Sequence, residues 1–156
     1  MSPTPAPPRA DGRRSFLSWL ARASLFAIPA ACAASATPRK EIRVVYHLDD
    51  AGRAIAAVRM LQNHLKADAN ARIVVVALSD GVDFLLKDAQ DSRGNPYEPM
   101  VDDLVLAGVS FQVCGNTLDA RKIPVSAVHP EARVVVSGAA EIARLQVEEG
   151  HAYYKP

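Results

Sequence analysis

The stretch that decides the fold is Ser110–Leu118, which reads Ser-Phe-Gln-Val-Cys-Gly-Asn-Thr-Leu. Apolar and polar side chains alternate along its first part as in a β-strand, and a glycine follows the cysteine. Asn116 or Thr117 is a favoured helix N-cap, so the pattern predicts a strand that turns at once into a helix. A thiol at such a junction lies next to backbone N–H groups that have no partner within the helix. Because these groups favour thiolate over thiol, we take Cys114 as the candidate functional residue.

The remaining apolar runs predict a sheet whose strands alternate with helices. Runs typical of strands occupy residues 42–47, 71–78, 132–136 and 152–156. Helical patterns occupy residues 51–67 and 97–107 and a stretch that opens at Gly138 and ends before Gly150, with shorter turns at 82–87 and 117–121. The first strand is almost continuously apolar, which is typical of a sheet covered on both faces. This order predicts a three-layer α/β/α sandwich with a mostly parallel, five-stranded sheet.

The first 36 residues have the pattern of a targeting segment. Paired arginines at positions 13 and 14 precede Ser-Phe-Leu, an Ala/Leu-rich stretch follows, and Ala34-Ser35-Ala36 is a small-residue cleavage site. We therefore expect a twin-arginine-type signal peptide at 1–36, cleaved near Ala36, and a single periplasmic domain at 37–156. The uncharged run 23–36 is too short for stable membrane insertion. An uncleaved amphipathic or disordered tail is the alternative.

Charge and cysteine usage follow from the same division. The formal net charge is +1, but the leader is basic, so the part after it is slightly acidic and no nucleic-acid surface is expected. Cys32 lies in the leader, which leaves Cys114 as the single cysteine of the mature chain, and a single cysteine cannot form an internal disulfide. Residues 28–32 faintly resemble a lipoprotein cleavage site, which would make Cys32 a lipidated residue.

Several residues are predicted to lie at the same sheet edge as the thiol. His47 ends the first strand and could deprotonate Cys114 or hold an oxyanion, although a histidine bonded to a loop backbone is an equal interpretation. The amides of Gly115 and Asn116, with Thr117 beside them, could hold an anion or a thiolate. The loop after the first strand has no Gly-rich phosphate cradle, and the histidines have no metal-ligand spacing. We therefore expect neither a cofactor nor a metal.

Three stretches resemble the DsrE/DsrF-like family, which includes small sulfur-relay proteins. They are residues 108–118, residues 136–142, and the ending 145–156, which reads Leu-Gln-Val-Glu-Glu-Gly-His-Ala-Tyr-Tyr-Lys-Pro. The resemblance spans residues 42–156. It implies a parallel α/β/α fold, a homo-oligomer (trimer or hexamer), and a sulfur donor or acceptor protein as partner. It also implies that Cys114 accepts sulfane sulfur as a persulfide.

The sequence is compatible with three functions. The first is a periplasmic sulfur carrier or sulfurtransferase that uses Cys114 with help from His47. The second is a non-catalytic oligomeric binding module of the same fold, in which Cys114 is structural. The third is a thiol-based redox sensor that passes through a sulfenic acid. The sequence leaves open whether the protein is an enzyme.

Overall fold

The computed structural model describes residues 41–156. The expected signal peptide, its cleavage site and Cys32 lie outside the described residues. Five strands form one sheet in the order β4-β3-β2-β1-β5, and every neighbouring pair is parallel. The strands are β1 (Arg43–Leu48), β2 (Arg72–Ala77), β3 (Ser110–Cys114), β4 (Ala132–Val135) and β5 (Ala152–Tyr154). The predicted five-stranded parallel sheet is therefore confirmed.

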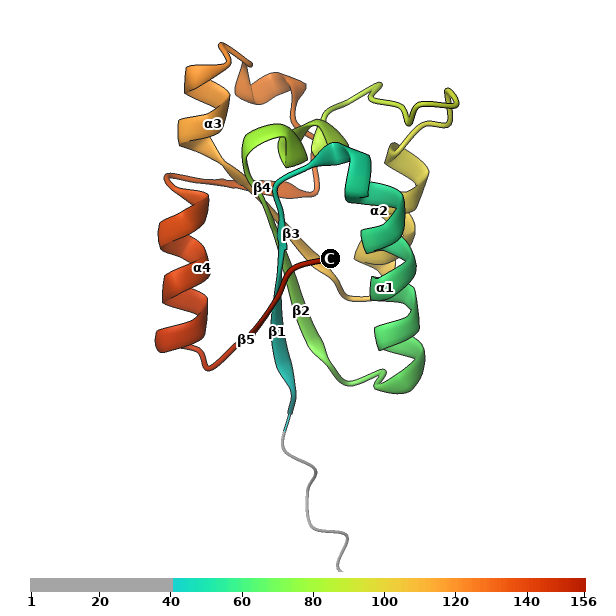
Figure 1. Cartoon of the computed structure of the whole chain (residues 1–156), viewed down its shortest axis with the longest axis vertical. Helices are drawn as coiled ribbons and strands as arrows, with labels where there is room; N and C mark the ends of the chain where they lie inside the picture. The colour runs from blue at the N-terminus through green and yellow to red at the C-terminus, as the bar shows by residue number, and fades with distance from the viewer. Residues whose placement is uncertain (1–40) are drawn as a thin grey trace, which may run out of the picture. The chain divides into compact units, whose positions relative to one another are not determined.

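Helices connect the strands and cover the two faces unequally. They are α1 (Ala54–Ala67), α2 (Glu98–Leu106), α3 (Gly115–Ala120) and α4 (Gly138–Val147), with 3-10 turns η1 (Ala51–Arg53), η2 (Ser79–Leu85) and η3 (Val125–Ala127). Figure 1 shows α1 and α2 on one side of the sheet and α4 on the other. The larger part of the core lies on the α1 side. The smaller cluster consists of Val45, Val76, Ile142 and Leu145.

Side-chain alternation assigns each strand residue to one of these faces. Phe111 and Val113 of β3 belong to the core on the α1 side. Gln112 and Cys114 alternate with them and therefore lie on the opposite face, which we call the α4 face. The same alternation places His47 on the α4 face, because Tyr46 and Leu48 belong to the α1 side. The candidate thiol and the candidate base thus share one face of the sheet.

The helix after the thiol begins earlier than the residue types predict. Cys114 itself is the N-cap of α3, and the helix starts at Gly115 rather than at Asn116 or Thr117. The reason is steric: a Cβ at position 115 would lie 3.0 Å from the carbonyl oxygen of Val135 in the neighbouring strand. Glycine removes that contact, so the chain can turn into the helix directly beside β4.

Two further boundaries differ from the sequence prediction. The turn predicted at 82–87 is the 3-10 helix η2, which begins at Ser79, and β5 ends at Tyr154 instead of continuing to the last residue. On α1, the Nδ1 atom of His64 lies 2.9 Å from the hydroxyl of Tyr46. Among residues 41–156, no helix has both the length and the apolar character that crossing a membrane requires.

Candidate functional site around Cys114

Cys114 is the last residue of β3, at the carboxyl edge of the sheet. Only 6% of the residue is exposed, because the start of α4 lies over it. A Cβ placed on Gly138 would lie 3.1 Å from the Cβ of Cys114 and 3.2 Å from the Cβ of Leu78. The first turn of α4 can approach the thiol this closely only because position 138 has no side chain.

Nearby polar groups shift the pKa of the thiol. Burial raises the pKa of Cys114, but the Thr117 hydroxyl and the backbone N–H groups of Gly138, Thr117 and Asn116 lower it, and the net pKa lies below the ordinary value. Donor groups near a sulfur atom stabilise a negative charge on it much more than they stabilise a neutral thiol. The site is therefore built to hold an anionic sulfur atom.

The Thr117 hydroxyl is held in the orientation that this role needs. Its oxygen accepts a hydrogen bond from the backbone N–H of Ser79 at 3.2 Å. Since a hydroxyl carries a single proton, an oxygen that already accepts from Ser79 is free to donate that proton to the sulfur. Ser79 adopts a left-handed backbone conformation, with φ at 50°, which is uncommon for a residue other than glycine. The first residue of η2 thus positions Thr117 beside the thiol.

The structure gives the predicted anion-holding residues distinct roles. The backbone N–H groups of Asn116 and Thr117 both lower the pKa of the thiol. The Asn116 N–H donates to the carbonyl of Val136 at 3.1 Å, which fixes its position at the start of α3. Gly115 contributes the tight turn beside β4 and no hydrogen bond to the thiol.

Sequence reasoning missed Gly138 as a member of this site. The signal that could have found it is the Ser137-Gly138 pair, which follows β4 and opens α4. Ser137 is the N-cap, and its hydroxyl accepts from the N–H of Ala140 at 3.4 Å. In parallel sheets such strand-to-helix junctions meet at one edge, and β4 is the direct neighbour of β3. Two junctions, each with a glycine, therefore converge on Cys114.

His47 shares the edge and the face but does not contact the thiol. It lies opposite Val76 of β2, and Val76 lies opposite Gln112 of β3. His47 is therefore two strands away from Cys114, and it is level with the residue two positions before Cys114 in β3. With strands about 4.8 Å apart, the separation is roughly 10 Å or more. His47 Nδ1 instead pairs with the Tyr153 hydroxyl at 2.7 Å. The structure therefore does not bring the two predicted catalytic residues together.

We expect His47 to make the folded state sensitive to mild acid. Burial lowers its pKa, Asp49 raises it and Lys155 lowers it again, with a net pKa below the ordinary 6.5. Between its folded pKa and 6.5 the unfolded chain binds more protons, so the free energy of unfolding falls as the pH drops through this window. His47→Gln should flatten that fall. Urea midpoints of both proteins at pH 7.5 and 5.5 measure it, and equal acid sensitivity in the two proteins would contradict the assignment.

The part of the chain that the structure describes contains no group of three or more His, Cys, Asp or Glu side chains placed to hold a metal ion.

The parallel α/β/α architecture, with a thiol at a strand-to-helix junction, defines a class of small α/β proteins. Within it, the DsrE/DsrF-like family matches residues 30–154, and the chain belongs to this family. The fold is accordingly the one that sulfur-relay-type proteins use. No curated protein is detectably similar to the chain.

Several solved structures are similar to this one, among them the following two. A protein of unknown function from Methanobacterium thermoautotrophicum, MTH1491, is 34% identical, with a TM-score of 0.67 over 74% of this chain and all of that one. The ychN protein from E. coli is 17% identical, with a TM-score of 0.59 over 74% of this chain and 98% of that one. The second likeness concerns the fold alone.

Proposed function

We propose that the protein is a sulfur carrier, or a sulfurtransferase-like protein, that accepts sulfane sulfur on Cys114 as a persulfide. One observation carries the proposal: Cys114 ends β3 at the start of α3 and directly beside Gly138 of α4, where the Thr117 hydroxyl and nearby backbone N–H groups lower the pKa of the thiol despite its burial. A thiolate is the nucleophilic form of cysteine. A persulfide is likewise anionic, and the same donors would stabilise it.

Thiosulfate can serve as the sulfur donor in the loading step, and no other reactant is then needed. The Cys114 thiolate attacks the sulfane sulfur and forms a new S–S bond. The bond between the sulfane sulfur and the sulfonate sulfur breaks, and sulfite leaves with the electron pair. Cys114 then carries a persulfide anion. An acceptor thiolate that attacks the outer sulfur regenerates the Cys114 thiolate, so no further oxidant or reductant is needed.

The intact mass of the protein tests this function. The chain with Cys32→Ser, in which Cys114 is the only thiol, is incubated with thiosulfate or polysulfide and then measured with and without reductant. We expect a gain of whole sulfur atoms that reductant reverses. Adding Cys114→Ser should abolish the gain completely. No gain in the protein that retains Cys114 would contradict the carrier function.

The same measurement distinguishes a second candidate, a non-catalytic binding module in which Cys114 is structural. The low exposure of Cys114, 6%, favours this candidate, since a nucleophile must be reached by its donor. A thiol reagent decides between the two. If Cys114 in the folded protein neither gains sulfur nor reacts with iodoacetamide, the thiol serves packing and the binding module is the better description.

We further propose a cellular location and partners for the protein. The twin-arginine-type leader would export it to the periplasm, with cleavage near Ala36, where a sulfur donor or acceptor protein would meet it. A homo-oligomer, trimer or hexamer, is supported by exposed large apolar side chains at Leu106, Val136 and Val147, each more than four-fifths exposed in the single chain. Light scattering of the purified protein measures the oligomer, and fractionation of the producing cells measures the location.

A further inference from the structure

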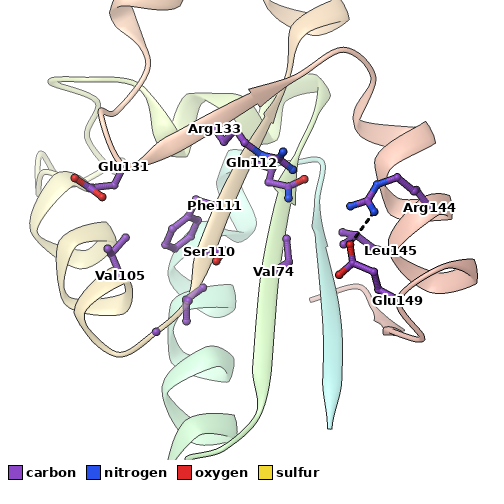
Figure 2. Close-up of a pocket in the computed structure, with 12 residues that line it drawn as sticks. Val74, Val105, Ser110, Phe111, Gln112, Glu131, Arg133, Arg144, Leu145 and Glu149 are labelled. Carbon is purple, nitrogen blue, oxygen red and sulfur yellow. Dashed lines mark hydrogen bonds and ion pairs between the residues drawn. The ribbon is translucent and has the colours of Figure 1, made fainter. Parts of the chain in front are cut away.

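Arginine side chains form two clusters of ion pairs near β3. Figure 2 shows the first, beside α4, where Arg144 pairs with Glu149 at 2.7 Å and Arg133 lies next to Gln112. Two carboxylates balance two guanidinium groups among the residues that line this hollow, and Cys114 is not one of them. The second cluster lies at the carboxyl edge of the sheet, on the side of the thiol.

This second cluster joins α3 to η2 (Figure 1). Arg121 is the C-cap of α3, and its Nη2 atom lies 2.8 Å from a carboxylate oxygen of Asp83 in η2. Its Nη1 atom donates to the carbonyl of Ser79 at 3.4 Å and lies 3.9 Å from the carboxylate of Asp80. One planar guanidinium group thus reaches three residues of η2 with donors in fixed directions, which a single ammonium group could not do.

Ser79 is the residue of η2 for which these contacts matter most. It is exposed, whereas the buried residues of the same turn begin at Gly81. Its φ of 50° lies in the left-handed region, which a residue other than glycine adopts only when its surroundings hold it there. Its N–H donates to the Thr117 hydroxyl oxygen at 3.2 Å, and its carbonyl accepts from Arg121. Contacts with α3 and its C-cap, rather than burial, therefore hold Ser79.

We propose that Arg121 is a positioning residue of the thiol site. Its guanidinium holds Ser79 in the conformation that aims the Ser79 N–H at the Thr117 oxygen. The proton of the Thr117 hydroxyl then stays free for donation to Cys114. Arg121 thus acts through Ser79 and Thr117 rather than on the sulfur itself. The inference rests on the proposed function, because it concerns how the nucleophilic form of Cys114 is maintained.

The thiolate population of the folded protein tests the proposal. The chain with Cys32→Ser is titrated between pH 5 and 10, and the ultraviolet absorbance of its thiolate is measured against the same chain with Cys114→Ser. Below the titration midpoint, Arg121→Gln should reduce the thiolate population by about threefold, a part of what one hydrogen bond to a charged group contributes. Arg93→Gln is the matched control and should leave the titration unchanged. Arg93 also faces an aspartate, Asp91 at 3.8 Å, but lies between η2 and α2.

A second variant separates positioning from a direct effect of charge. If the charges act through space, removing a cation disfavours the thiolate and removing an anion favours it. Asp83→Asn removes an anion, so a direct charge effect would increase the thiolate population. If the ion pair positions η2 instead, Asp83→Asn should reduce the population, in the same direction as Arg121→Gln.

A double variant tests whether Arg121 acts through the hydroxyl. In the Thr117→Val background, Arg121→Gln should have no further effect on the thiolate population, because the group through which it acts is gone. A full additional loss in this background would mean that Arg121 affects the thiol by another route.

Three results would overturn the proposal: equal titrations of Arg121→Gln and Arg93→Gln, a larger thiolate population in Asp83→Asn, or an undiminished effect of Arg121→Gln in the Thr117→Val background. The titration uses no sulfur donor, so its outcome does not depend on whether Cys114 accepts sulfur. A protein that shows the expected shifts but gains no mass with thiosulfate would keep Arg121 as a positioning residue and lose the carrier function.

Discussion

Gly81→Ala is expected to reduce the free energy of unfolding by about 3 kcal/mol, near the upper end for overpacking. A Cβ at position 81 would lie 2.1 Å from the carbonyl oxygen of Leu48 and 2.9 Å from the backbone nitrogen of Asp49. Both are backbone atoms of a central strand and its exit, so no side-chain rotation relieves the overlap. The end of β1 or the turn η2 must move instead.

Thermal unfolding measures this prediction, with a midpoint roughly 10 °C lower for a domain of this size. Gly108→Ala is the matched control. Gly108 has φ at 91° and no atom within 4 Å of an added Cβ, so only the backbone conformation is penalised, by about 1 kcal/mol. If the two variants lose similar stability, close packing at Gly81 is not the reason for its glycine.

The effect at Gly81 would extend to the thiol. Gly81 belongs to η2, whose first residue, Ser79, donates to the Thr117 hydroxyl. Displacing η2 would release that hydroxyl from its orientation toward Cys114. We therefore expect the thiol of Gly81→Ala to react more slowly at neutral pH, even in the fraction that stays folded.

The fold could be predicted from the sequence because each strand is an apolar run separated from the next by a helical pattern. The runs at 42–47 and 71–78 are almost continuously apolar, and only a sheet covered on both faces requires this. The boundary at Gly115 was predicted less well, since residue types suggested that a side chain caps the helix. The deciding contact there is with the Val135 carbonyl of another strand, and no local pattern encodes it.

The site was predictable only in its local part. Cys114, Asn116 and Thr117 are neighbours in the chain, and the strand-to-helix junction predicted their convergence. Gly138 comes from another strand-to-helix junction and could be placed at the thiol only once β4 was known to neighbour β3. His47 was placed at the right edge, but its hydrogen-bond partner Tyr153 is 106 positions away, and the sheet order that separates it from Cys114 is a tertiary property.

Thr117→Val is expected to slow the reaction of Cys114 at pH 7 by about tenfold. Among the groups that lower the pKa of this thiol, the Thr117 hydroxyl has a larger effect than any of the three backbone N–H groups. A hydrogen bond to a charged group contributes about 1.5 kcal/mol or more, which corresponds to roughly a factor of ten in the thiolate population. Valine has nearly the same shape as threonine but leaves the sulfur without this donor.

The sign of the effect follows from the thiolate equilibrium. Losing a donor that stabilises the anion raises the pKa of Cys114, so less thiolate is present at pH 7. At high pH the thiol still ionises fully. The rate of iodoacetamide labelling between pH 5 and 10 measures this shift, and the loss should diminish at the alkaline end. Thr117→Ser, which keeps the hydroxyl, is the matched control and should retain most of the reactivity.

A different pattern would assign Thr117 another role. If Thr117→Val and Thr117→Ser slow labelling equally at all pH values, the methyl group and packing matter rather than the hydroxyl. If neither changes the rate, the backbone N–H groups of α3 and α4 alone set the thiol's reactivity. Because Ser79 donates to the Thr117 oxygen, the hydroxyl proton is free for donation to the sulfur, and the hydroxyl is therefore expected to decide the outcome.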